Sequence, residues 1–178
     1  MANNTVVIAL AGKGGVGKTS LSAAIVRLLT EKRPDAKILA IDADPAVGLS
    51  VALGVEVKET LDQIRKRVAE DVTGKLKDTQ DILAEAKFRL YDAMAEQKGF
   101  AFLAIGRPEA AGCYCAINTY LKKVIEMLVD DFDYVVISFS VIRSGRGALL
   151  TISPISSYIT SSSATSLIVS MIFSPFWL

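Results

Sequence analysis

One stretch of the chain decides the fold, and it reads Ala9-Leu10-Ala11-Gly12-Lys13-Gly14-Gly15-Val16-Gly17-Lys18-Thr19-Ser20. It follows an apolar run and opens an amphipathic helical pattern. The spacing Gly12-x4-Gly17-Lys18-Thr19 is that of a P-loop, in which backbone N–H groups and a helix N-terminus contact nucleotide phosphates. The stretch therefore predicts a phosphate-binding loop between a strand and a helix.

Each residue type in this loop has a physical role in binding a triphosphate. The glycines let the backbone approach the phosphates without Cβ clashes, so that several N–H groups turn inward as an anion nest. Lys18 would contact the β- and γ-phosphates, and the Thr19 hydroxyl would bind Mg²⁺. The predicted nucleotide-binding residues are Gly12, Lys13, Gly14, Gly15, Val16, Gly17, Lys18, Thr19 and Ser20.

The same stretch also fits a dinucleotide-binding pattern. Gly12-x-Gly14-x-x-Gly17 has the glycine spacing of that pattern, and Asp42 at the end of the next predicted strand would be the ribose ligand. Lys18 and Thr19 favour the triphosphate, because a dinucleotide site requires neither a phosphate-binding lysine nor a metal-binding hydroxyl. A glycine-rich loop without any ligand accounts for the glycines but not for Gly-Lys-Thr at this position.

Apolar runs alternate with helical patterns along the first 137 residues. The predicted strands are 5–11, 37–42, 100–105 and 134–137. The predicted helices lie at 19–33, around 61–68, at 78–97 and at 117–128. Together with the glycine-rich loop, this alternation predicts an α/β fold of the P-loop NTPase class, with a mostly parallel sheet flanked by helices.

Two carboxylates follow the second predicted strand in the sequence Asp42-Ala43-Asp44-Pro45. Ligands of open α/β sheets bind at the carboxyl edge of the strands, and the glycine-rich loop follows the preceding strand at that same edge. Mg²⁺ requires oxygen ligands, which favours a functional role for both carboxylates. An Asp before a Pro is also typical of a simple turn.

Composition excludes several classes of protein. Hydrophobic residues make up 51% of the chain and the net charge is +1, with no long basic block, so no nucleic-acid partner is predicted. The N-terminal sequence Met1-Ala2-Asn3-Asn4 has neither a basic nor an apolar leader region. Two cysteines are too few for a disulfide framework. We therefore expect a cytoplasmic protein.

Cys113 and Cys115 form a C-x-C pair in a loop after the third predicted strand. Two thiolates cannot complete a four-coordinate site for a soft metal, and the chain has no histidine. Two such pairs facing each other in a symmetric dimer would supply four sulfurs, a set suited to Zn²⁺ or Ni²⁺. The alternative is two small, partly buried residues near a helix start, and the spacing alone does not decide between them.

Two motifs together resemble a known family. Lys13-Gly14-Gly15-Val16-Gly17-Lys18-Thr19, with a lysine at each end, resembles the deviant Walker A motif of the MinD, ParA and nitrogenase iron protein family. The segments Asp42-Ala43-Asp44-Pro45 and Gly106-Arg107-Pro108-Glu109…Gly112-Cys113-Tyr114-Cys115 resemble the CooC group within it. Proteins of that group are ATPases that help to insert nickel into carbon monoxide dehydrogenase. The resemblance covers about residues 5–137.

The resemblance implies a nucleotide-dependent homodimer with ATP, Mg²⁺ and Ni²⁺ or Zn²⁺ as cofactors and carbon monoxide dehydrogenase as its partner. Lys13 would contact the phosphates of the partner subunit, and Lys18 those of its own. Thr19 and Asp42 would support Mg²⁺, and Asp44 would orient the attacking water. Cys113 and Cys115 would bind Ni²⁺ or Zn²⁺ between the subunits. The alternative functions are a MinD- or ParA-like positioning ATPase and a truncated nucleotide-binding fragment without turnover.

The family pattern stops at Ser138. In the family the fourth strand ends in an Asp of the switch II segment, whereas this chain has Ser138-Phe139-Ser140, and a hydroxyl cannot replace the charge of a carboxylate near Mg²⁺. All 19 acidic residues precede Ser138, and the remaining residues, 138–178, include 12 serines and two charges. The resemblance therefore implies a P-loop ATPase domain at 1–137 that is truncated after the fourth strand, and the distribution of residues indicates an atypical Ser-rich, nearly uncharged tail at 138–178. Three explanations of this tail compete. A changed reading frame near codon 138 fits the pattern best. The others are a membrane-associated tail, which the prolines of this segment disfavour, and an unusual native soluble ending.

Overall fold

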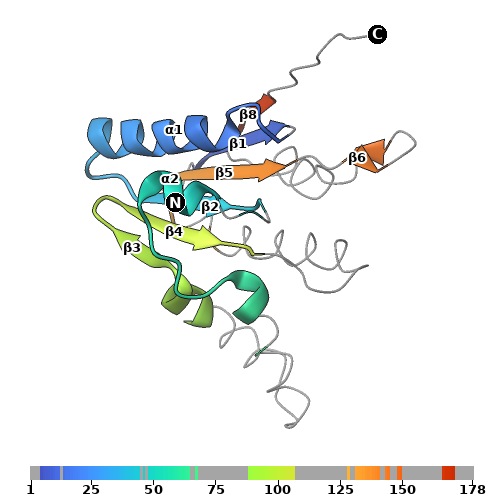
Figure 1. Ribbon diagram of the computed structural model, residues 1–178. Helices are drawn as coiled ribbons and strands as arrows, with labels where there is room; N and C mark the ends of the chain where they lie inside the picture. Colours follow the sequence, from blue (N-terminus) through green and yellow to red (C-terminus); the bar gives the residue numbers. More distant parts are fainter. Residues whose placement is uncertain are drawn as a thin grey trace.

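A six-stranded sheet runs through the molecule in the order β3-β4-β2-β5-β1-β8 (Figure 1). The computed structural model describes residues 5–12, 14–44, 46, 48–64, 67, 88–106, 128, 131–140, 143–144, 148–149 and 166–170. The strands are β1 (Val6–Gly12), β2 (Ile38–Asp42), β3 (Ala95–Gln97), β4 (Phe100–Ala104), β5 (Tyr134–Ser140), β6 (Arg143–Ser144), β7 (Ala148–Leu149) and β8 (Ser166–Ser170). The helices with assigned bounds are α1 (Lys18–Lys32) and α2 (Gly48–Leu53).

The four predicted strands form the centre of the sheet. They are β1, β2, β4 and β5, and each neighbouring pair among them is parallel. All five residues of β2 are buried. The apolar run Ile38-Leu39-Ala40-Ile41 predicts this for a strand covered on both faces, and the buried residue that ends the strand is the charged Asp42. Because parallel neighbours need a crossover connection, α1 joins β1 to β2 across one face. The predicted α/β fold with a mostly parallel sheet is confirmed.

Apolar side chains pack on both faces of the sheet. One cluster joins α1 and α2 to Leu10, Ala40 and Val136, and the other joins Leu39 and Ile137 to the side chains on the opposite face. Alternation along each strand divides the residues between the clusters, since successive side chains point to opposite faces. The second cluster is covered by Leu61, Ile64, Leu90 and Leu128 from the predicted helical segments.

The predicted helix over 78–97 is wrong at its C-terminal end. Residues 88–93 are helical, but Ala95–Gln97 form strand β3, which pairs antiparallel with β4. The physical reason is the two-residue turn at Lys98 and Gly99, because Gly99 has a φ of 92° and allows the chain to reverse. Pairing with β4 therefore overrides the helical preference of Ala-Glu-Gln. The rest of this predicted helix lies outside the described residues.

Strand β5 continues beyond the four residues that the sequence predicts, through Ser138 to Ser140. Residues 166–170 then form β8, which pairs in parallel with β1 at the edge of the sheet, and β6 and β7 form a separate antiparallel pair. These three later strands were not predicted. Over the described part of the chain, no helix is both long and apolar enough to cross a membrane.

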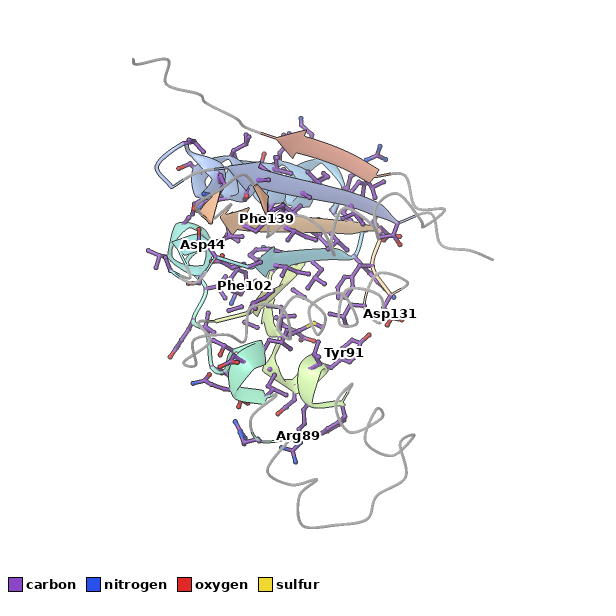
Figure 2. All side chains as sticks on the ribbon, turned by 90° about the vertical axis from the view of Figure 1, so that its right-hand side faces the viewer. Asp44, Arg89, Tyr91, Phe102, Asp131 and Phe139 are labelled. Carbon is purple, nitrogen blue, oxygen red and sulfur yellow. The ribbon has the colours of Figure 1, made fainter. Side chains whose placement is uncertain are left out.

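The parallel arrangement gives the sheet two chemically different edges. Figure 2 shows Asp44 at the edge where the arrows of β2 and β5 end, and Asp131 at the opposite edge. The segment after β4 is anchored at the carboxyl edge, because the N–H of Ile105 donates to the Asp42 carbonyl at 2.9 Å and the N–H of Asp62 donates to the Ile105 carbonyl at 3.1 Å. The chain therefore leaves β4 beside the end of β2.

Gly106 lies in a conformation that other residues rarely adopt, with a φ of 83°. A Cβ atom there would lie 2.6 Å from Oγ1 and 2.7 Å from Cβ of Thr60. Thr60 itself is fixed, because its N–H and its hydroxyl both donate to Oε1 of Gln63, at 2.8 and 3.1 Å. Gly106 therefore has both a backbone and a packing reason to be glycine.

We predict that Gly106→Ala lowers the free energy of unfolding by about 3 kcal/mol, because backbone strain adds to the overlap with Thr60. Gly54→Ala is the matched control. Gly54 also has a positive φ, of 71°, but a Cβ atom there would meet nothing within 4 Å, so its cost is about 1 kcal/mol. Urea denaturation of the two variants measures both values, and equal losses would show that Thr60 does not contribute.

Candidate functional site

The glycine-rich loop connects the end of β1 to the start of α1. Gly15 and Gly17 have φ values of 83° and 87°, in the left-handed region, and Gly17 is the N-cap of α1. A Cβ atom on Gly14, Gly15 or Gly17 would meet no atom within 4 Å, so the loop borders open space. Gly17 has no side chain to accept the first N–H groups of α1, which leaves them suited to an anion.

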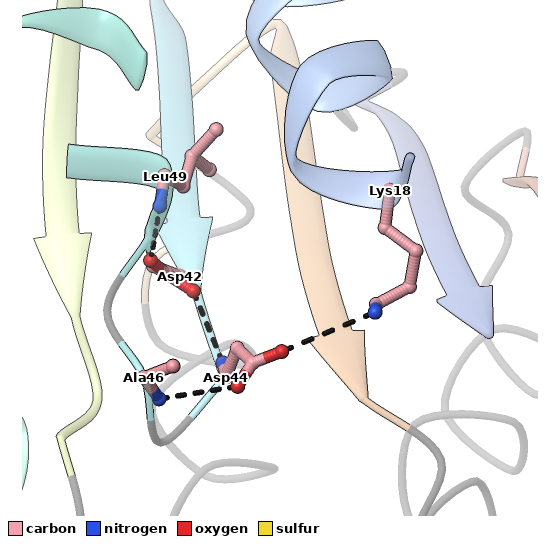
Figure 3. A network of polar contacts seen from close by, with 5 residues as sticks. All are labelled: Lys18, Asp42, Asp44, Ala46 and Leu49. Carbon is pink, nitrogen blue, oxygen red and sulfur yellow. Dashed lines mark hydrogen bonds and ion pairs between the residues drawn. The ribbon is translucent and has the colours of Figure 1, made fainter. Parts of the chain in front are cut away.

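Lys18 is the first residue of α1 and is buried, with 4% of its side chain exposed. Its Nζ atom lies 4.0 Å from Oδ2 of Asp44 (Figure 3). A buried ammonium is costly unless an anion lies near it. The structure therefore brings together the lysine and one of the two carboxylates that the sequence predicts at this site.

Thr19 and Ser20 continue the first turn of α1. Thr19 is partly buried and lies against the start of α2, since a Cβ atom on Gly48 would be 3.7 Å from its Cγ2 and 3.8 Å from its Oγ1. Ser20 is exposed. The Thr19 hydroxyl is therefore near the beginning of α2, on the carboxyl side of β2.

Asp42 ends β2 and has 1% of its surface exposed. Its Oδ2 accepts the N–H of Leu49 at 2.8 Å and its Oδ1 accepts the N–H of Asp44 at 3.0 Å. The pKa of the Asp42 carboxyl is raised, chiefly by burial and also by the negative charge of Asp44, although the two hydrogen bonds and the Lys18 ammonium lower it. Asp42 therefore connects the end of β2 to the start of α2, because its carboxylate accepts one N–H from the turn and one from the helix.

Asp44 takes part in both a turn and an ion pair. Its Oδ1 accepts the N–H of Ala46 at 3.1 Å, which is the turn that an Asp before a Pro favours. Its Oδ2 lies beside Lys18, with 20% of the Asp44 side chain exposed. The turn and the functional interpretation of Asp44 are therefore compatible, because each uses a different carboxylate oxygen.

Ser138 lies next to Asp42 in the sheet. β5 runs between β1 and β2, and Ser138 is in register with Leu10 on one side and Asp42 on the other. It is 1% exposed, and it shares the face of β5 to which Val136 belongs, where α1 and α2 pack. The side chain at position 138 therefore belongs to the same buried layer as Asp42 and the start of α1.

Three of the predicted site residues belong to parts of the chain that the structure does not describe. Lys13, Cys113 and Cys115 lie outside the described residues. Within the ranges that the structure describes, no group of three or more Cys, Asp or Glu side chains is arranged to hold a metal ion. The proposed cysteine site stays a prediction from the sequence.

The sequence did not reveal the role of α2. This helix contributes the Leu49 N–H to Asp42 and places Gly48 against Thr19. Its six residues are too few for helical periodicity to be seen. The one available signal is Gly48 itself, six residues after Asp42, because a larger residue there would approach Thr19 more closely.

We predict a pH dependence of stability that depends on Asp42. Because the pKa of the Asp42 carboxyl in the folded state is raised above its ordinary value of 3.8, the folded state holds this proton more tightly than the unfolded state. The stabilising contribution of the proton is complete below pH 3.8 and is lost as the pH rises through the folded pKa. Unfolding of wild type and Asp42→Asn across this range should show the wild type losing stability relative to the variant, and a constant difference would contradict the assignment.

Two curated proteins are similar in sequence to about three quarters of this chain. Two proteins of Methanocaldococcus jannaschii, each described as an uncharacterised ATP-binding protein, are 36% and 29% identical over 137 residues. The matches cover 74% and 73% of this chain but 51% and 52% of those proteins. The chain thus spans about half the length of the curated relatives it matches.

Solved structures share the fold at low sequence identity. An ATP complex of a McdA variant from Cyanothece has a TM-score of 0.59 at 22% identity and covers 94% of this chain and 56% of that one. A ParA family ATPase from Chlorobium tepidum has a TM-score of 0.54 at 16% identity, covering 94% and 73%. Cobyrinic acid a,c-diamide synthase from Mycobacterium smegmatis, with bound ADP and magnesium, has a TM-score of 0.55 at 21% identity. That match covers 92% of this chain and 72% of the synthase chain.

The predicted resemblance to a P-loop ATPase family is therefore confirmed at the level of the family, while the narrower CooC assignment stays a prediction. A family model described as anion-transporting ATPase matches residues 5–139, which include the glycine-rich loop, Asp42, Asp44 and Ser138. This chain belongs to the anion-transporting ATPase family.

Proposed function

We propose that the chain binds ATP with Mg²⁺ at residues 12–20 and that it derives from an ATPase. The observation that carries the proposal is the buried ammonium of Lys18 at the start of α1, directly behind glycines with positive φ and an open approach. A helix N-terminus with a buried cation suits a polyphosphate. The description of both Methanocaldococcus relatives as ATP-binding supports this choice of ligand.

In the proposed reaction, a water molecule attacks the γ-phosphate and ADP leaves. Lys18 would stabilise the charge that develops on the phosphate oxygens, and Asp44 would orient the water. Thr19 and Asp42 would hold Mg²⁺, which neutralises phosphate charge when bound. Lys13 would contribute from the partner subunit of a homodimer. Positioning and charge supply most of the catalysis in phosphoryl transfer.

Ser138 limits turnover in this proposal. It belongs to the same buried layer as Asp42 and is in register with it, yet it brings no charge. A carboxylate at this position would add a second anion near the proposed Mg²⁺ site. The chain as it stands would therefore bind nucleotide better than it hydrolyses it, which agrees with the alternative of a nucleotide-binding fragment.

We predict that wild type binds ATP in the presence of Mg²⁺ and that Lys18→Ala weakens binding by about a hundredfold. Ser138→Asp should raise the hydrolysis rate by about tenfold or more, because it supplies the missing charge. Ser138→Asn is the matched control, with the same size and no charge, and it should not change the rate. Phosphate release measures turnover, after circular dichroism has verified that each variant folds.

The absence of ATP binding by folded wild type would contradict the proposed function. Binding without turnover in Ser138→Asp would instead favour the nucleotide-binding fragment.

We further propose that the protein is a metallochaperone for carbon monoxide dehydrogenase, with Ni²⁺ as its cargo, or Zn²⁺ in its place. This proposal rests on the sequence from Gly106 to Cys115, of which the structure describes Gly106 alone. Gly106 lies against Thr60 and directly follows Ile105, whose N–H donates to the Asp42 carbonyl at the end of β2. A MinD- or ParA-like positioning ATPase, in which the cysteines have no metal role, is the alternative, and the shared fold is compatible with it. A cytoplasmic location suits either role.

Metal content separates these two functions. We predict that the purified protein binds about one Ni²⁺ or Zn²⁺ per dimer and that the double variant Cys113→Ser, Cys115→Ser loses the metal, because serine hydroxyls are poor ligands for soft metals. Elemental analysis after gel filtration measures the ratio. Equal metal content in the variant and the wild type would reject the site and favour the positioning ATPase.

For the tail, we propose a changed reading frame near codon 138. The family match ends at residue 139, next to the point where acidic residues stop. Strand β5 nevertheless continues through Ser140, and its extra residues pair with β1. The backbone of a strand can be completed by many sequences, whereas the chemistry at position 138 depends on the side chain.

A further inference from the structure

The carboxylate of Asp44 is fixed in front of Lys18. Its Oδ1 accepts the N–H of Ala46, and its backbone N–H donates to Asp42, as Figure 3 shows. The remaining oxygen, Oδ2, lies 4.0 Å from the Lys18 ammonium, which is 4% exposed. The turn from 42 to 46 thus holds the negative charge of Asp44 next to Lys18. Lys18 is the lysine that binds the nucleotide phosphates in the proposed function.

A phosphate that contacts Lys18 brings a second negative charge to the same ammonium. Like charges a few ångströms apart repel more strongly where water is excluded than at an exposed surface. We propose that Asp44 competes with the nucleotide phosphates for Lys18, so that phosphate binding displaces the Asp44 carboxylate. This inference rests on the proposed function, because it requires phosphates at Lys18.

The displacement would act on the turn before α2. When the Asp44 side chain leaves Lys18, its Oδ1 also moves away from the N–H of Ala46, whereas the bond from Leu49 to Asp42 does not involve Asp44. Asp42 thus keeps the start of α2 in place while Asp44 changes partner. The carboxylate released from Lys18 is then available for the water that attacks the γ-phosphate, so the same side chain reports phosphate binding and serves the reaction.

Asp44→Asn tests the competition, because Asn keeps an oxygen acceptor for Ala46 and removes the charge. Calorimetric titration with ADP and with pyrophosphate, in EDTA so that no metal takes part, should show about tenfold tighter binding to the variant than to wild type. The gain should persist at about 0.5 M salt, because the ammonium is nearly buried and poorly screened.

Asp35→Asn is the matched control. Asp35 is exposed and lies with Val6 and Tyr134, the first residues of β1 and β5, at the opposite edge of the sheet. This variant makes the same change in net charge far from Lys18, and its affinity at high salt should equal that of wild type. An equal gain in both variants would overturn the competition and assign the effect to net charge.

The two proposals fail in different ways. If folded wild type and Asp44→Asn bind neither ADP nor pyrophosphate, the proposed function is wrong. If both bind with equal affinity, the function stands and the competition is wrong. A second measurement needs no variant: ADP should accelerate amide hydrogen exchange at Ala46 in the wild type and leave Leu49 unchanged. Unchanged exchange at Ala46 on saturation with ADP would contradict the displacement.

Discussion

The buried charge of Lys18 is the constraint on which the site depends. An ammonium at 4% exposure requires an anion nearby, and the carboxyl edge of the sheet supplies Asp44 for this purpose. Asp44 reaches Lys18 because Asp42 accepts two backbone N–H groups and so closes the segment from the end of β2 to the start of α2. Burying Lys18 thus organises the turn, the second carboxylate and the position of α2.

The parallel sheet makes this arrangement possible. β1 and β2 both end at the carboxyl edge of the sheet, because α1 returns the chain from the end of β1 to the opposite edge, where β2 begins. β5 lies between these two strands and brings Ser138 into register with Asp42. A change confined to one position of β5 can therefore remove chemistry without removing the strand. This separation is compatible with a chain that has the glycine-rich loop before α1 and a serine at position 138.

The central strands could be predicted because their apolar runs are long and bounded by clear loop residues. The glycine-rich loop could be predicted because Gly15 and Gly17, which both have positive φ values, stand between an apolar run and a helical pattern. Strand β3 could not be predicted from the sequence, because Ala95 to Gln97 have a local preference for helix. The strand forms only through hydrogen bonds with β4 in the folded sheet. The contact between Lys18 and Asp44 could not be derived either, because they are 26 positions apart and meet only after β2 has paired in the sheet.

The central claim is that phosphates bind at the loop before α1. Amide chemical shifts of the isotopically labelled chain, recorded while ATP and Mg²⁺ are added, test it most directly. If phosphates bind there, the largest shifts lie at Gly14 to Ser20 and at Asp44. Shifts that cluster instead at the opposite edge, around the cavity of about 480 Å³ lined by Arg33 and Tyr134, would contradict it.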